Sequence, residues 1–183
     1  MSEVRLIPGQ RDTTVDSPWA KLLVTDERGR YLLVRWKLQW EVPGTALSIS
    51  AAVDEDSCAR FLDGFANEIG VNIQTPRLAA DVLQHFARGN MPTPFRWYEA
   101  RLEGGTGKPP AGDPDVDQVA WMPLSEVLAA MPYPAARRIL EQIAQWPHQT
   151  IRGEYEVDYT VNPPGGSLRI IREFAPEASG TGP

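Results

Sequence analysis

Cysteine is almost absent from this chain of 183 residues, and Cys58 is the only one. A single cysteine excludes an intrachain disulfide, and a chain without disulfides is typical of the cytoplasm. We therefore predict a cytoplasmic protein in which Cys58 is a small buried apolar residue rather than a nucleophile.

Runs of basic residues and long apolar runs are also missing. Lys and Arg number 18 against 24 Asp and Glu, which gives a net charge of −6 and a pI of about 5.0. This balance argues against electrostatic binding to nucleic acid or to anionic membranes. No apolar run reaches the roughly 20 residues of a membrane helix, and residues 1–5 lack the build of a signal peptide. We expect neither nucleic acid nor a membrane as a partner.

The common catalytic signatures are missing as well. The sequence contains no phosphate loop, no dinucleotide fingerprint, no Gly-x-Ser-x-Gly elbow and no zinc cluster. The two histidines, His85 and His148, have no companion ligand at metal-binding spacing. A lone histidine is more often structural than functional. His85, near the end of a predicted strand, is the better candidate.

Hydrophobic residues make up 42% of the chain, which is enough for one sizeable core. We predict a polar arm at residues 1–16, one domain at 17–150, a hairpin at 151–174 and a disordered tail at 175–183. The apolar patterns predict strands at 20–25, 30–36, 78–86, 95–102 and 119–122, and helical stretches from about residue 54 and at 124–131 and 134–146.

The predicted C-terminal hairpin has strict alternation. Apolar Tyr155, Val157, Tyr159 and Val161 alternate with Glu154, Glu156, Asp158 and Thr160, which is typical of a half-buried strand. On the returning strand, Arg169 and Arg172 are placed to face these acids. An isolated hairpin is marginal in water. It must therefore pack on the domain, extend its sheet, or pair with a second copy of the chain.

The helix that begins near residue 54 carries the most informative pattern. Cys58, Leu62, Phe65 and Ile69 recur at helical spacing and predict one buried stripe. Aspartate 54 or 56 is suited to cap the start, and Gly70 to end the helix in a left-handed conformation.

Residues 55–71 resemble the box of the Nudix hydrolases, G-x5-E-x7-R-E-U-x-E-E-x-G-U, where U is a bulky aliphatic residue. The first glutamate of the box falls on Glu55 and the last on Glu68, and the closing pair falls on Gly70 and Val71. Asp63-Gly64 stands where the box has Arg-Glu, and Asn67-Glu68 where it has Glu-Glu.

Two further segments are similar to the family's pattern. Residues 117–124 resemble its late strand, before which many members place a metal carboxylate; Asp115 or Asp117 is the candidate here. Pro43-Gly44 resembles the glycine loop that presents a backbone carbonyl to the metal. This loop lies about four residues further from Glu55 than in the family's pattern and lacks the second glycine. The inserted residues are a candidate lid.

The resemblance covers roughly residues 17–146. It implies a Nudix-type α/β/α sandwich with a mixed sheet, to which the C-terminal β-hairpin is added. In the family, the helix's glutamates bind Mg²⁺ or Mn²⁺ and activate water. Here Gly64 can neither bind metal nor accept a proton. Two explanations of Gly64 stay open: sequence drift after catalysis was lost, or a requirement for space that a ligand occupies.

The resulting site hypothesis has three parts. The catalytic candidates are Glu68, Asp63, Glu55 and His85. The ligand-binding candidates are Gly64, Asn67, Trp36, Trp40, Trp97 and Arg96, although core tryptophans and a cross-strand arginine pair are the ordinary alternatives. The metal candidates are Glu68 and Asp115. No cofactor is expected, with Mg²⁺ or Mn²⁺ as the alternative.

Three functions follow from these patterns. The first is an atypical Nudix-fold enzyme that acts on a small organic or diphosphate-linked metabolite. The second is an inactive module that binds a metabolite or a protein. The third is a metal-dependent nucleoside-diphosphate-type hydrolase with relocated ligands. The expected partner is a small molecule, and a homodimer is a further prediction.

Overall fold

The structure is a computed structural model that describes residues 18–47, 54–87, 92–159 and 166–174. Its centre is a mixed ten-stranded sheet with the order β10-β9-β6-β7-β1-β2-β3; β4 pairs with β1, β5 with β7, and β8 with β2. The strands are β1 Trp19–Thr25, β2 Tyr31–Trp36, β3 Gln39–Glu41, β4 Gly44–Ala46, β5 Val71–Ile73, β6 Arg77–Phe86, β7 Thr93–Gly105, β8 Val116–Met122, β9 Ile151–Asp158 and β10 Ser167–Phe174.

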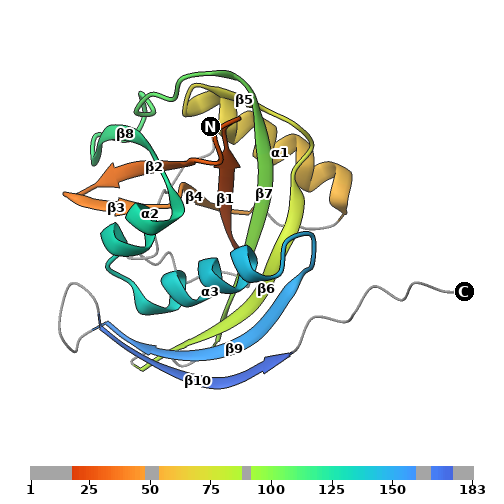
Figure 1. Cartoon of the computed structure of the whole chain (residues 1–183), viewed down its shortest axis with the longest axis vertical. Coiled ribbons are helices and arrows are strands. Elements are labelled where there is room, and N and C mark those ends of the chain that lie inside the picture. Colours follow the sequence, from red (N-terminus) through yellow and green to blue (C-terminus); the bar gives the residue numbers. More distant parts are fainter. Residues whose placement is uncertain (1–17, 48–53, 88–91, 160–165, 175–183) are drawn as a thin grey trace, which may run out of the picture.

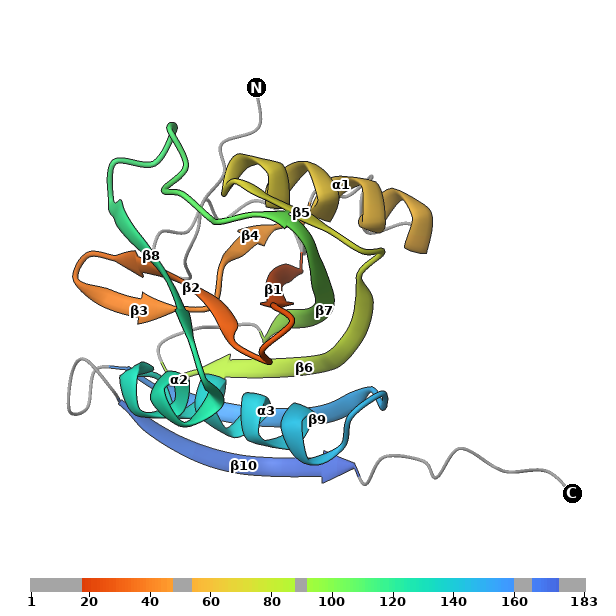
Figure 2. The same ribbon diagram turned by 45° about the horizontal axis from the view of Figure 1, so that its top comes forward.

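Helices cover both faces of this sheet. Helix α1 (Glu55–Glu68) packs on one face, and α2 (Leu124–Ala130) and α3 (Pro134–Gln145) pack on the other (Figure 2). Each face has its own apolar core. The predicted α/β/α sandwich with a mixed sheet is therefore confirmed.

Strand β1, predicted at residues 20–25, is buried on both faces of the sheet. Leu22 and Val24 belong to the core under α1, and Leu23 belongs to the core under α2 and α3. Because successive side chains point to opposite faces, a strand between two helical layers reads as a continuous apolar run. Lys21 is the one charged residue inside that run, and it is buried.

The C-terminal hairpin extends the sheet, as one of the three alternatives for it predicts. Strand β9 runs parallel to β6, and β10 lies outside β9 at the edge (Figure 1). Arg169 pairs with Glu156 at 2.5 Å, and Arg172 with Glu154 at 2.6 Å, which confirms the predicted cross-strand pairs. The parallel pairing to β6 could not be predicted, because the alternation fixes a strand but not its neighbour.

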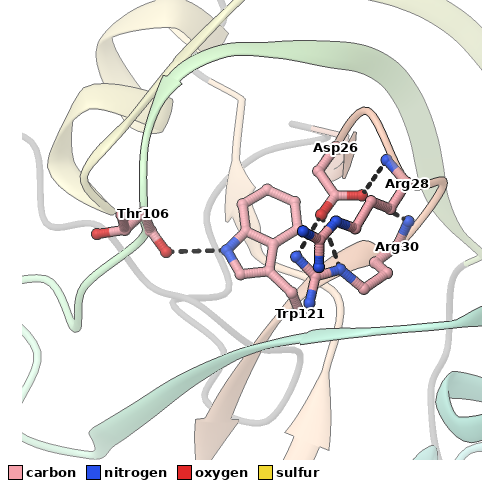
Figure 3. A network of polar contacts seen from close by, with 5 residues as sticks. All are labelled: Asp26, Arg28, Arg30, Thr106 and Trp121. Carbon is pink, nitrogen blue, oxygen red and sulfur yellow. Dashed lines mark hydrogen bonds and ion pairs between the residues drawn. The ribbon is translucent and has the colours of Figure 1, made fainter.

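Two groups of hydrogen bonds stabilise the region around the paired strands β2 and β8 (Figure 3). In the turn between β1 and β2, the Asp26 carboxylate accepts hydrogen bonds from the backbone N–H groups of Arg28 and Arg30 and from the Arg30 side chain. The Trp121 indole donates to the Thr106 carbonyl oxygen at 2.8 Å, which ties β8 to the loop after β7. Trp121 is thus a structural anchor.

The short strands β3, β4 and β5 were not predicted as strands. Each has three residues, too few for alternation to register. The predicted arm at 1–16, the tail at 175–183, Val161 and residues 48–53 of the candidate lid lie outside the described residues. Among the described residues, no helix has the length and apolarity that crossing a membrane requires.

Candidate functional site on two faces of the sheet

Helix α1 places the box residues as the sequence predicts. Its buried residues are Cys58, Leu62, Phe65 and Ala66, and Asp54 caps the start by accepting a hydrogen bond from the Ser57 N–H at 2.8 Å. Gly70 ends the helix at φ +76°, where a side chain would also collide with Lys108. The stripe faces the sheet, so the opposite side of α1 points to solvent.

We call this solvent-facing side the open face of α1; it carries Glu55, Asp63, Gly64, Asn67 and Glu68, all exposed. The Asn67 side-chain amide donates to the Asp63 backbone oxygen at 2.9 Å. A Cβ on Gly64 would meet no atom within 4 Å. Neither Glu55 nor Glu68 forms an ion pair within the described residues. These groups are accessible but lie apart from further ligands.

The remaining acidic candidates for a metal are engaged elsewhere. Asp115 lies 3.3 Å from the Lys37 ammonium group. Asp117 accepts two hydrogen bonds from Arg35, which lower the pKa of its carboxyl group. Among the described residues, no group of three or more His, Cys, Asp or Glu side chains is arranged to hold a metal ion. The described donor set therefore does not fit the divalent ion that the box implies.

His85 is separate from α1. Its Nε2 lies 2.5 Å from Glu154 on β9, and Glu154 also pairs with Arg172. The hydrogen bond to His85, followed by the charge of Arg172, lowers the pKa of the Glu154 carboxyl group. The ligand candidate Arg96 lies 3.9 Å from Asp81, a cross-strand pair. The structure thus gives His85 a hydrogen-bond partner and Arg96 an ion-pair partner on the sheet.

The three tryptophans proposed to wall one pocket are divided between the faces. Trp36 packs against the core under α1, with the Lys37 ammonium 4.4 Å from its ring centroid. Trp40 and Trp97 belong to the core on the opposite face. Of these three, Trp97 lines a pocket in the described part of the chain.

That pocket lies between the sheet and α3. Its enclosed volume is about 20 Å³, room for about one water molecule, and its mouth opens to solvent. We call it the α3-face pocket; its lining residues are Lys21, Glu41, Val42, Gln84, Phe95, Trp97, Met131, Tyr133, Ala136 and Tyr159.

A buried ion pair forms the polar side of the α3-face pocket. The Lys21 ammonium group lies 3.2 Å from Glu41 Oε2 and donates to the Val42 carbonyl oxygen at 3.2 Å. Lys21 is 5% exposed and Glu41 is 2% exposed. Burial raises the pKa of the Glu41 carboxyl group, and the charge of Lys21 together with hydrogen bonding from Lys21 and Tyr133 opposes that rise. Gly44 permits the arrangement, because a Cβ there would lie 2.7 Å from Lys21 Cδ.

The pocket also collects polar atoms without partners. In the described part of the chain, three buried side-chain polar atoms lack a hydrogen bond, and two of them, Glu41 Oε1 and Trp97 Nε1, belong to residues that line this pocket. Gln84, which is 4% exposed, also lines the pocket. Buried polar groups are nearly always paired, and each exception requires an explanation.

Aromatic residues complete the wall. Tyr133, at the start of α3, donates to Gln39 Oε1 at 3.0 Å, and its ring packs edge-on against Tyr159 at a centroid distance of 4.9 Å. Tyr159 follows β9 and also contacts Phe86. Burial raises the pKa of both tyrosine hydroxyl groups above the usual value. The C-terminal hairpin thus contributes one wall of the pocket.

Sequence reasoning selected Trp97 but missed the other polar residues of this pocket. Lys21, Glu41, Gln84 and Tyr159 lie on four different elements, so no spacing pattern connects them. One signal was present: a lysine in the middle of the apolar run 20–24 must be buried, and a buried lysine needs a carboxylate.

No family model and no curated protein matches this sequence. Solved structures do match. The MutT protein of Bacillus halodurans is 15% identical over 83% of this chain and 97% of its own, with a TM-score of 0.60. An ADP-ribose pyrophosphatase of Streptococcus suis is 16% identical over 75% of this chain and 98% of its own, at 0.51.

A third similar structure is the Nudix domain of NrtR from Shewanella oneidensis, solved with ADP ribose. It is 19% identical over 72% of this chain and 86% of its own, with a TM-score of 0.51. At these identities the similarity defines the fold. The chain has the fold of the Nudix hydrolases, as residues 55–71 predict.

Proposed function

We propose that this protein binds a small metabolite in the α3-face pocket, as a Nudix-fold module that does not use the usual metal chemistry of the fold. The observation that carries the proposal is Trp97 Nε1, a buried donor without a hydrogen-bond partner, in a wall that it shares with the buried Glu41 carboxylate. A buried polar atom without a hydrogen bond costs about 1–3 kcal/mol, and a ligand that pairs with it recovers that free energy.

The surroundings of these atoms support a ligand. Phe95, Met131 and Tyr133 are among the apolar and aromatic residues that line the pocket. A mostly apolar pocket with a few convergent polar groups is typical of small-molecule sites. One similar structure is described as an ADP-ribose pyrophosphatase and another holds ADP ribose. These descriptions support a small organic or diphosphate-linked metabolite as the class of ligand.

The test is ligand-induced stabilisation across a metabolite library that includes diphosphate-linked compounds, measured by thermal unfolding and then by calorimetry. We expect at least one compound to stabilise the wild-type protein and to bind Trp97→Phe more weakly. Glu126→Gln, an exposed position on α2, serves as the control. A ligand affinity that neither Trp97→Phe nor Gln84→Leu changes contradicts the proposal. A library in which no compound binds contradicts it as well.

A second candidate is an atypical enzyme that acts on a small organic or diphosphate-linked metabolite at the open face of α1. The favouring observation is that Asp63 and Glu68 are exposed there beside Gly64, which leaves open space. Turnover of a library compound that is lost in Glu68→Gln supports this candidate. Ligand binding without turnover supports the binding module.

The metal-dependent reading has its own test. Because the described donors of α1 do not form a cluster, we expect no saturable binding of Mn²⁺ in a calorimetric titration. Stoichiometric binding that Glu68→Gln abolishes favours the relocated-ligand hydrolase instead. The homodimer stays a prediction, which sedimentation analysis tests.

A further inference from the structure

We infer that Tyr133 and Tyr159 form a gate over the α3-face pocket, and that a ligand enters only when one of these two rings turns away from the other. The inference rests on the proposed function and names what controls access to that same site.

The closed pocket is too small for the proposed ligand. Its enclosed volume is about 20 Å³, which is room for about one water molecule. Pockets that bind small organic molecules typically measure about 300–1,000 Å³. A metabolite that reaches Trp97 must therefore enlarge the pocket, and some part of its wall has to move.

The inner wall of the pocket is fixed. Val42 and Trp97 are 1% exposed and Phe95 is 2% exposed. Because protein interiors are close-packed, a shift of any of these side chains displaces its neighbours as well. Lys21 and Glu41 are buried and hold each other in an ion pair of 3.2 Å. We therefore expect these side chains to keep their positions when the pocket opens.

The rim of the pocket differs from the inner wall. Its partly exposed lining residues are Tyr133, Ala136 and Tyr159. The methyl group of Ala136 has no rotamer that opens a path, whereas a change of χ1 moves a whole tyrosine ring. The two tyrosine rings contact each other edge to face at a centroid distance of 4.9 Å. Separation of these rings is thus the simplest way to widen the pocket.

The side chain of Tyr133 is free to turn, but its backbone is restricted. Pro132 and Pro134 flank it, and a residue before a proline is confined to an extended conformation. Tyr133 accordingly has φ −91° and ψ 115°. Its hydroxyl group donates to Gln39 Oε1 at 3.0 Å and also interacts with the Glu41 carboxylate. These hydroxyl contacts hold the ring in the closed position.

Tyr159 follows the last residue of β9. Besides Tyr133, its ring contacts Phe86 at a centroid distance of 5.8 Å. It also adjoins Gly166, where a Cβ would lie 2.8 Å from Tyr159 Cδ1. Aromatic contacts of this kind are weak individually. We expect either ring to leave the closed position on the microsecond to millisecond timescale of active-site lids.

Hydrogen exchange of the Trp97 indole N–H tests the gate without any ligand. Trp97 Nε1 is buried and lacks a hydrogen-bond partner in the described chain, so its exchange depends on the access of water. Its NMR signal is identified by its loss in Trp97→Phe. In the wild type we expect exchange at least about tenfold slower than that of the Trp146 indole, which is 40% exposed.

Two gate variants should accelerate the exchange of Trp97. Tyr133→Phe keeps the ring and removes the hydroxyl contacts, so the rate should rise about fivefold. Tyr159→Leu removes the ring and should give a larger increase. Tyr31→Phe is the matched control, because Tyr31 is also partly buried and packs against the same core but does not line the pocket. It should leave the Trp97 rate unchanged.

The backbone amides of β1, measured in the same samples, separate opening of the gate from global unfolding. Faster exchange of Trp97 without faster exchange of these amides supports the gate. Three results overturn it: a wild-type Trp97 indole that exchanges as fast as that of Trp146, a rate that neither gate variant changes, or an acceleration that the β1 amides share.

The two proposals fail in different ways. If the gate variants accelerate exchange as expected but no library compound binds, the proposed function is contradicted and the opening of the pocket stands. If a compound binds and Trp97→Phe weakens it, while the gate variants leave the exchange unchanged, the gate is overturned and the proposed function stands.

Discussion

Helix α1 and the α3-face pocket lie on opposite faces of one sheet, and they differ in what burial does to their polar groups. On the open face of α1, Asp63 and Glu68 are exposed, so water solvates them and they need no partner. In the pocket, Glu41 and Trp97 are almost completely buried, and each retains an unpartnered atom. The recognisable sequence motif lies on α1, and the buried polar atoms without hydrogen-bond partners lie in the α3-face pocket.

The largest expected effect comes from breaking the ion pair in the pocket. Lys21→Met leaves Glu41 buried without its counter-charge and should lower the free energy of unfolding by about 3–5 kcal/mol. In this variant the raised pKa of Glu41 favours the protonated form in the folded state. Stability should therefore fall as pH rises from 5 to 8. Urea titration at both pH values measures this.

A paired variant provides the control for that loss. Lys21→Met combined with Glu41→Leu removes both charges and should recover most of the lost stability, because a buried pair replaced by apolar residues is often neutral. A single Lys21→Met that costs less than about 1 kcal/mol contradicts the buried pair.

Two adjacent residues of α1 should differ almost as much in what their substitution does to the free energy of unfolding. Leu62 is fully buried and Asp63 is exposed. Leu62→Ala should lower the free energy of unfolding by about 2–5 kcal/mol, because it leaves a cavity. Asp63→Ala should change it by less than about 0.5 kcal/mol. Similar losses for both variants, by chemical denaturation, show that the open face of α1 is not a solvated surface.

The C-terminal hairpin should contribute less to the stability of the protein at low pH. Glu173 on β10 accepts hydrogen bonds from Arg138 and from the Tyr155 hydroxyl group, and the Arg138 hydrogen bond lowers the pKa of Glu173 below its usual value of 4.5. The folded state therefore favours the ionised form. Its contribution is complete above about pH 4.5 and is lost as the pH falls below that value.

The variant Glu173→Gln isolates this contribution. At pH 6.5 it should be less stable than the wild type by about 1 kcal/mol, and the difference should shrink at pH 3.5. A difference that stays constant between the two pH values rules out the ionised Glu173 as its source.

The smallest effect should come from Gly64→Ala. A Cβ at this helical position meets open space, so the substitution should raise the free energy of unfolding by about 0.5–1 kcal/mol through helix propensity. Affinity for a ligand of the α3-face pocket should not change. If this variant is more stable but binds the ligand more weakly, the ligand binds at α1 and not in the α3-face pocket.

The sequence predicts the elements better than the site, and for a physical reason. The stripe of Cys58, Leu62 and Phe65 depends only on local spacing, and α1 forms as that spacing requires. The α3-face pocket depends on the pairing of distant strands. Glu41 faces Lys21 because the chain doubles back between β1 and β3, and Tyr159 reaches the pocket because β9 pairs with β6. No local pattern encodes these contacts.

The residue-by-residue resemblance led to α1 because a motif is a local pattern. It identified the fold and aligned Glu55, Gly64 and Glu68 with a helix that the structure confirms. The roles of these residues remain proposals. Lys21 shows what the sequence could have predicted about the pocket. A charge inside an apolar run indicates a buried ion pair, although the sequence does not identify the partner, which lies twenty positions away.

The most direct measurement is the affinity of one ligand, the best-stabilising library compound, for the wild type and for single variants at the two sites. The account predicts a fivefold to tenfold loss of affinity in Trp97→Phe and wild-type affinity in Glu68→Gln. A ligand that Glu68→Gln releases, while Trp97→Phe binds it like the wild type, contradicts the assignment of the ligand to the α3-face pocket.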